Sequence, residues 1–199
     1  MVKNYFVGSF DVFGKIALVK FPEKTLKKEK QNFAKKLMGT HKAIKTVLEK
    51  IGKFHGRLRK QETRWVAGEK TKEVLYKENG CVFRFNIDDT YFSPRLSSER
   101  IDVAHKIKKG DKVLVMFAGV GVYPIVLYKY KKPRQIVGVE IGKDCCKWFK
   151  ENLKFNKVPL DRVKVVQGDV KKKITLELGK FDVVIMARPN LRESFLKWV

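Results

Sequence analysis

The sequence predicts an α/β protein in which a doubly wound parallel sheet follows a smaller α+β domain. In the second half of the chain, short apolar runs alternate with helical periodicity, the pattern of parallel strands joined by helices. In the first half, an amphipathic segment precedes alternating stretches broken by glycines, which indicates a helix and antiparallel strands. We therefore expect two domains, spanning residues 1–90 and 91–199.

The first domain is predicted to begin with a strand over Lys15–Phe21, which contains the apolar run Ile-Ala-Leu-Val. Over Thr25–Lys50, apolar residues recur mostly three or four positions apart with lysines between them, which predicts one or two amphipathic helices broken near Gly39. Phe54–Phe85 is predicted to form a small antiparallel sheet, with a hairpin turn at Asn79-Gly80.

The second domain is predicted to begin with a helix that Ser97 caps, that carries Glu99 in its first turn, and that Gly110 ends. A second, strong helix is predicted over Lys143–Phe155. The predicted strands of the parallel sheet are Lys112–Phe117, Gln135–Glu140, Arg162–Gln167 and Phe181–Met186.

The charge of the chain indicates a polyanionic partner. Lys and Arg number 45 against 21 Asp and Glu, giving a formal net charge of +24. Both halves of the chain, divided at Gly110, are basic, so the charge is not confined to a tail. Nucleic acid is the first candidate for such a partner. The lysine-rich face of Thr25–Lys50 is either a solvated surface or a phosphate-contacting one.

Several protein classes are disfavoured by the remaining composition. The amino terminus has no signal-peptide pattern, and no apolar run approaches the ~18 residues of a membrane span. Cys81, Cys145 and Cys146 are odd in number and lack a CxxC spacing, so we expect buried free thiols in a reducing cytoplasm. The three histidines show no zinc spacing, and we expect no metal site.

A glycine loop and two acidic residues follow successive predicted strands. Phe117-Ala118-Gly119-Val120-Gly121 ends the first strand, Glu140 ends the second, and Asp169 follows the third. At the carboxyl edge of a parallel sheet, Glu140 can accept the hydroxyls of a ribose and Asp169 can accept an adenine amino group. Taken singly, the loop could be an ordinary tight turn and Asp169 an ordinary helix cap.

The order of these elements resembles that in S-adenosylmethionine-dependent methyltransferases of the Rossmann-like class I fold. The segments Tyr91–Arg100, Gly56–Arg59 and Ala67-Gly68 sharpen the resemblance. Together with the glycine loop they resemble the archaeal and eukaryotic tRNA (guanine-37-N1)-methyltransferases and their wybutosine-pathway relatives, over roughly Gly14–Phe195. The resemblance implies S-adenosyl-L-methionine as cofactor and the tRNA anticodon stem-loop as partner.

The resemblance also implies roles for individual residues. Arg59 would steady the guanine carbonyl oxygen, and Glu99 would take the proton from guanine N1; these roles suit a cation and a carboxylate base. Plain phosphate contact stays open for Arg59, and a capping box with Ser97 or an ion pair with Arg100 stays open for Glu99. The implied cofactor contacts are Arg100, Phe117, Ala118, Gly119, Gly121, Glu140, Ile141, Asp169 and Val170.

Three features depart from the family pattern. The family usually carries an aspartate directly before Phe-Ala-Gly, where this chain has Met116. The fourth-strand motif of the guanine-37 enzymes is Asn-Leu-Pro, and the asparagine position aligns with Ala187 in this chain. The chain ends at Leu191–Val199, in a predicted helix after the fourth strand, so the sheet is expected to be truncated there. Phe181–Met186 would then lie at an open edge, which a second chain could complete.

Three functions follow from these observations. The first is a tRNA methyltransferase acting on N1 of guanine 37. The second is transfer of the aminocarboxypropyl group of the same cofactor, as in the wybutosine-pathway relatives. The third is a non-catalytic tRNA-binding subunit, which Met116, Ala187 and the missing strands favour.

Overall fold

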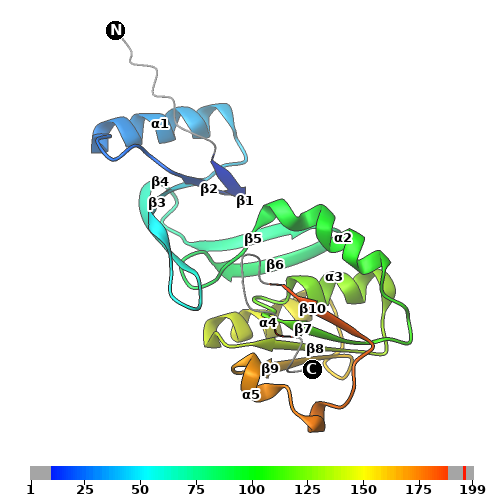
Figure 1. The fold of residues 1–199 in the computed structure, drawn as a ribbon. Helices are drawn as coiled ribbons and strands as arrows, with labels where there is room; N and C mark the ends of the chain where they lie inside the picture. The colour runs from blue at the N-terminus through cyan, green and yellow to red at the C-terminus, as the bar shows by residue number, and fades with distance from the viewer. Residues whose placement is uncertain (1–9, 188–194, 196–199) are drawn as a thin grey trace. The chain divides into compact units, whose positions relative to one another are not determined.

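The computed structural model describes residues 10–187 and 195 (Figure 1). The chain divides into two compact units that interleave in sequence. The first unit holds the residues up to Tyr76 together with Asn86–Pro94, and the second holds Lys77–Phe85 and the residues from Arg95 onward. A two-stranded sheet, made of β5 (Glu73–Glu78) and β6 (Cys81–Asn86), carries the chain between them.

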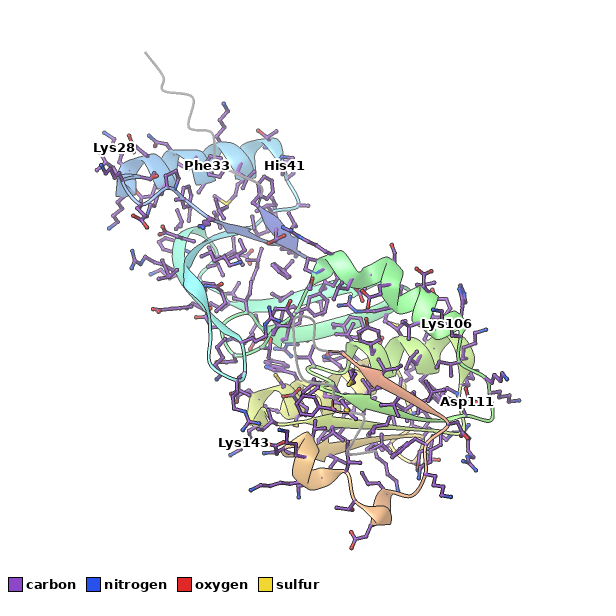
Figure 2. All side chains as sticks on the ribbon, in the orientation of Figure 1. Lys28, Phe33, His41, Lys106, Asp111 and Lys143 are labelled. Carbon is purple, nitrogen blue, oxygen red and sulfur yellow. The ribbon has the colours of Figure 1, made fainter. Side chains whose placement is uncertain are left out.

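The first unit is built on a four-stranded sheet in the order β1-β2-β3-β4. The strands β1 and β2 are antiparallel, β2 and β3 are parallel, and β3 and β4 are antiparallel. Helix α1 (Lys27–Thr40) packs against this sheet; Phe33 lies on its sheet side and Lys28 extends into solvent (Figure 2). The strands are β1 (Asp11–Phe13), β2 (Ile16–Val19), β3 (Thr46–His55) and β4 (Lys60–Gly68).

The predicted strand over Lys15–Phe21 is confirmed as β2, but the helical prediction for the end of Thr25–Lys50 is wrong. Residues from Thr46 onward form β3, paired on one side with β2 and on the other with β4. Spacings of three and one between Ile44, Val47 and Leu48 fit a buried helix face and a central strand alike. Pairing with two distant segments decides between them, because it satisfies the backbone groups on both sides of β3.

The hairpin predicted at Asn79-Gly80 is confirmed between β5 and β6. Both turn residues have positive φ, 51° for Asn79 and 64° for Gly80, as expected for a tight two-residue hairpin turn. The single antiparallel sheet predicted over Phe54–Phe85 is divided, because β4 belongs to the four-stranded sheet and β5–β6 stands apart from it.

The second unit contains a parallel sheet in the order β10-β7-β8-β9, which confirms the predicted doubly wound architecture. Helices cover both faces: Phe149 of α4 packs beside Gly138, whereas Val137 and Val139 face an apolar cluster that includes Val170. The strands are β7 (Lys112–Met116), β8 (Gln135–Glu140), β9 (Val163–Gln167) and β10 (Val183–Met186), and the helices are α2 (Ser97–His105), α3 (Val122–Lys131), α4 (Lys143–Phe155) and α5 (Val170–Lys173).

Two details of this unit differ from expectation. The N-cap of α2 is Leu96, and the Ser97 hydroxyl donates to Asn79 Oδ1 at 3.2 Å. The helix ends at His105, five residues before Gly110. Within the described part of the sheet, β10 is an edge strand, and the helix predicted over Leu191–Val199 lies outside the described residues apart from Phe195.

Candidate functional site

The carboxyl ends of β7, β8 and β9 place three sequence-predicted segments at one edge of the parallel sheet. The loop Phe117–Gly121 follows β7, Glu140 ends β8 and Ile141 follows it, and Asp169 follows β9. Because the strands are parallel and adjacent, residues far apart in sequence meet there. In open α/β sheets, ligands bind in the crevice outside this edge.

The glycine loop adopts a conformation that most side chains disfavour. Phe117, Gly119 and Gly121 all have positive φ, at 57°, 57° and 88°. Gly121 also has no room for a side chain, since a Cβ there would lie 2.1 Å from Cδ2 of Phe149. The loop is therefore a specific, close-packed turn that brings backbone N–H groups to the sheet edge.

The Glu140 side chain connects the glycine loop after β7 to the loop that follows β8. Its carboxylate accepts the N–H of Gly119 at 2.9 Å through Oε2 and the N–H of Gly142 at 2.7 Å through Oε1. Glu140 is 8% exposed; its bond from Gly142 is buried, and its bond from Gly119 is partly buried. An ionised carboxylate offers about four acceptor positions, and two remain for a ligand such as a ribose diol.

Asp169 performs the capping role that the sequence left open. Its Oδ1 accepts the N–H of Lys171 at 3.0 Å as the N-cap of the short helix α5. The side chain is half-buried, and the following Val170 is 3% exposed within the apolar cluster under the sheet edge. Capping does not exclude ligand contact, because the bond to Lys171 uses one of about four acceptor positions that an ionised carboxylate offers.

Phe117 and Ala118 link the loop to the core. The Phe117 ring makes an edge contact with Phe195 at a centroid distance of 5.1 Å and packs against the apolar cluster. Ala118 is buried, and its N–H donates to the carbonyl oxygen of Val139 at 3.0 Å. The half-buried Ile141 lies beside Glu140 at the same edge. These residues make an apolar floor around the polar atoms of the loop.

Glu99 has a partner that the sequence did not indicate. Its exposed carboxylate accepts a hydrogen bond from the Tyr123 hydroxyl, Oε1 to Oη, at 2.7 Å. Tyr123 lies at the start of α3 and is 8% exposed; burial, followed by the Glu99 carboxylate, raises the pKa of its phenol above the usual range. The phenol therefore stays protonated and acts as a fixed donor that orients Glu99.

Arg100 points into the interior of the second unit. Its Nη1 lies 2.7 and 2.8 Å from the two carboxylate oxygens of Glu78, and Arg100 is only 3% exposed. Burial raises the pKa of the Glu78 carboxyl, while the Arg100 guanidinium opposes that shift. The cation thus anchors α2 to β5 directly beside Glu99.

Arg59 lies in the first unit, at the turn between β3 and β4. Its N–H donates to the carbonyl oxygen of Gly56 at 3.1 Å, and its φ is 51°. The guanidinium lies 4.3 Å from the centroid of the Tyr91 ring, a cation–π contact. The half-exposed side chain is therefore directed by the ring.

Comparison with known proteins identifies the family. Residues 74–199 match the TRM5/TYW2 methyltransferase domain, and residues 3–71 match the TYW2 N-terminal domain. The chain belongs to the TRM5/TYW2 methyltransferase family. Members of this family are S-adenosylmethionine-dependent tRNA methyltransferases that act in tRNA modification, and the resemblance inferred from sequence is confirmed.

Three relatives define the chain's place in the TRM5/TYW2 family. The tRNA (guanine(37)-N(1))/4-demethylwyosine(37)-methyltransferase Taw22 of Nanoarchaeum equitans is 38% identical over 155 residues, covering 78% of this chain and 50% of the relative. The tRNA (guanine(37)-N(1))-methyltransferase Trm5b of Pyrococcus abyssi is 34% identical over 196 residues, which cover 98% of this chain and 57% of the relative. The solved complex of aTrm5 with tRNALeu superposes with a TM-score of 0.83 at 28% identity, covering 92% of this chain and 53% of that one.

The chain spans about half the length of these relatives. None of the helices in the described part of the chain has the length and apolar character needed to span a membrane. At the sheet edge where the family carries an aspartate, Met116 is fully buried in the apolar cluster. Ala187 follows β10 and donates its N–H to the carbonyl oxygen of Met116 at 3.2 Å.

Proposed function

We propose that this chain binds S-adenosylmethionine at the carboxyl edge of its parallel sheet and uses Glu99 as the proton acceptor in methylation of guanine 37 of tRNA. The observation that carries the proposal is the exposed Glu99 carboxylate, fixed through Oε1 by a buried tyrosine. No hydrogen bond to its Oε2 comes from residues 10–187 or 195, so this oxygen can receive a proton.

The residues at the sheet edge fit the cofactor. The remaining acceptor positions of Glu140 would hold the ribose hydroxyls, and Asp169 would accept from the adenine amino group. Phe117, Ile141 and Val170 supply apolar surface for the adenine ring. When bound, the cofactor supplies an electrophilic methyl group on a sulfonium sulfur.

The chemistry requires a base because guanine N1 carries a proton that must leave as the methyl group arrives. Glu99 lies in the first turn of α2, where the helix dipole favours the ionised carboxylate. As the proton passes to Oε2, the Tyr123 hydroxyl holds Oε1 and keeps the carboxylate in place. We further propose that the Arg59 guanidinium stabilises negative charge developing on the guanine carbonyl oxygen.

Single-turnover methyl transfer to tRNA tests Glu99. Glu99→Gln keeps the shape and the bond from Tyr123 but cannot take a proton, so the rate is expected to fall by about 10²–10⁴ with both ligands still bound. Tyr123→Phe removes only the orienting donor and is expected to cost a smaller factor, about tenfold, as for one hydrogen bond to a charged group. A wild-type rate for Glu99→Gln would make Glu99 a structural residue.

A second candidate is methylation of 4-demethylwyosine at the same position, because the Nanoarchaeum equitans relative is named for both reactions. Two tRNAs that differ only in carrying guanine or 4-demethylwyosine at position 37 separate the two activities. Cofactor labelled separately in its methyl and carboxypropyl groups tests the aminocarboxypropyl alternative in the same assay. A chain that binds tRNA but shows no heat of binding with the cofactor would be a non-catalytic subunit.

A further inference from the structure

Glu99 lies on a helix that is too short to be stable by itself. Helix α2 spans nine residues, below the roughly 12 residues that an isolated helix needs to form in water. Its N-cap, Leu96, makes no side-chain capping hydrogen bond. The orientation of the first turn, and with it that of the Glu99 carboxylate, therefore depends on contacts from outside the helix.

Two consecutive residues of the β5–β6 hairpin hold this first turn. Asn79 donates from Nδ2 to the carbonyl oxygen of Ser97 at 3.0 Å, and its Oδ1 accepts from the Ser97 hydroxyl at 3.2 Å. Glu78 accepts from Nη1 of Arg100 at 2.7 and 2.8 Å, and both of these side chains are buried. The hairpin thus binds α2 on both sides of Glu99 in the sequence.

Two asparagines of α4 fix the hairpin in turn. Asn152 accepts from the N–H of Arg84 at 2.7 Å and donates to the carbonyl oxygen of the same residue at 3.1 Å. Asn156 makes the same reciprocal pair with Val82, at 2.8 and 2.6 Å. The two amides, one helical turn apart, therefore satisfy backbone groups along the edge of β6 opposite β5, as a neighbouring strand would.

Asn152 also contacts the glycine loop. Its Nδ2 donates to the carbonyl oxygen of Val120 at 3.0 Å, within Phe117–Gly121, and Asn152 is fully buried. One side chain therefore bonds both the loop proposed to hold S-adenosylmethionine and the hairpin that holds α2. Hydrogen bonds and a short backbone segment thus connect the glycine loop, through Asn152 and the hairpin, to Ser97.

We propose that Asn79 is a positioning residue for Glu99, through which the β5–β6 hairpin keeps the proton-accepting carboxylate at a fixed place relative to the cofactor loop. The role rests on the proposed function, since it requires that Glu99 take the proton. Asn79 acts through the first turn of α2. A general base must lie within hydrogen-bond reach of its proton, so a shift of this turn by about 1 Å is enough to slow the transfer.

Asn79→Gly removes the contact and keeps the turn. The φ of Asn79 is 51°, which glycine adopts without strain, and Gly-Gly is also favoured in this kind of hairpin turn. Ser97→Ala removes the hydroxyl bond alone and leaves the bond to the backbone carbonyl. Ser98→Ala is the matched control, because Ser98 is the exposed neighbour in the same turn and has no hydrogen bond to the hairpin within the described residues.

The assay is single-turnover methyl transfer to tRNA by the whole chain, at a temperature where circular dichroism shows every variant folded. Asn79→Gly is expected to lower the rate by about 10- to 100-fold. Ser97→Ala should lower it by about 2- to 10-fold, and Ser98→Ala by less than about twofold. The Kd values for S-adenosylmethionine and tRNA should stay within about twofold of wild type, because the contact affects the reacting geometry alone.

A Glu99→Gln background separates positioning of the base from support of the fold. In that background Asn79→Gly should change the residual rate by less than about twofold, because no proton acceptor is left to position. An equal loss in both backgrounds, or a wild-type rate for Asn79→Gly, would overturn the role alone while Glu99→Gln still lowers the rate. A wild-type rate for Glu99→Gln would overturn the proposed function and the role that rests on it. Ser97→Ala repeats the comparison without any change in the hairpin.

Discussion

Replacing Glu140 by glutamine tests whether its carboxylate both stabilises the loops around the cofactor site and binds the cofactor. The change keeps the length of the side chain and removes its charge. Glu140 accepts from Gly119 and Gly142, and both donors are fixed backbone N–H groups. The glutamine amide has one acceptor oxygen and one donor nitrogen, so one of the two N–H groups must face another donor.

The expected magnitude follows from these two bonds. Leaving one buried N–H without an acceptor costs about 1–3 kcal/mol, and exchanging a charged acceptor for a neutral one weakens the other bond by about 1 kcal/mol. Glu140→Gln should therefore lower the free energy of unfolding by about 2–4 kcal/mol. For a chain of this size, the corresponding fall in Tm is about 4–16 °C.

Cofactor affinity should fall with stability, because the same carboxylate is proposed to accept the ribose hydroxyls. Loss of hydrogen bonds to a charged acceptor predicts a Kd for S-adenosylmethionine raised by about 10- to 150-fold. Differential scanning fluorimetry measures the Tm, and isothermal titration calorimetry measures the Kd at a temperature where the variant is folded. Glu177→Gln, an exposed carboxylate of the same unit, is the matched control and should change neither quantity. An unchanged Tm in Glu140→Gln would refute the assigned contacts, and an unchanged Kd would refute the proposed ribose site.

Four further outcomes are expected. Gly121→Ala should destabilise the fold by about 3 kcal/mol or more in urea denaturation, because its Cβ would collide with Phe149 at a φ of +88°; an unchanged midpoint would contradict the packing of the loop. Burial raises the pKa of the Cys81 and Cys146 thiols to about 11, so iodoacetamide should label neither in the folded protein at pH 8. Because these thiols ionise at lower pH when unfolded, stability should be retained below pH 9 and decline as the pH approaches about 11. Affinity for tRNA should fall with a log–log salt slope of several negative units, as the +24 charge predicts, and a flat salt dependence would remove that basis.

The two central strands of the parallel sheet, β7 and β8, were predictable because they are buried on both faces. Both contain a continuous apolar run, Val113–Met116 in β7 and residues 136–139 in β8, which is enough to find them. Their order along the chain then placed the glycine loop, Glu140 and Asp169 at one edge. The position of these residues at a common edge followed from sequence because parallel strands bring their carboxyl ends together.

Residues that depend on packing between helices or on strand register were not predictable. Tyr123 meets Glu99 only because α3 packs beside α2, and no periodicity links two residues 24 positions apart. Trp65 is exposed because Val66 is an extra residue in β4, a bulge that an alternating pattern cannot reveal. The strand β3 was mistaken for helix because its partners β2 and β4 decide its conformation.

Met116 explains why Glu140 should be hard to replace. Its side chain is fully buried with Val139 and Val170, so a carboxylate at that position would be desolvated among apolar groups. The end of β7 therefore contributes packing, and its polar atoms at the edge are those of the backbone. The neighbouring strand has no carboxylate with which to take over the two N–H bonds or the ribose contact. Substitution of Glu140 should therefore lower cofactor affinity more in a chain with methionine at position 116 than in a relative with aspartate at that position.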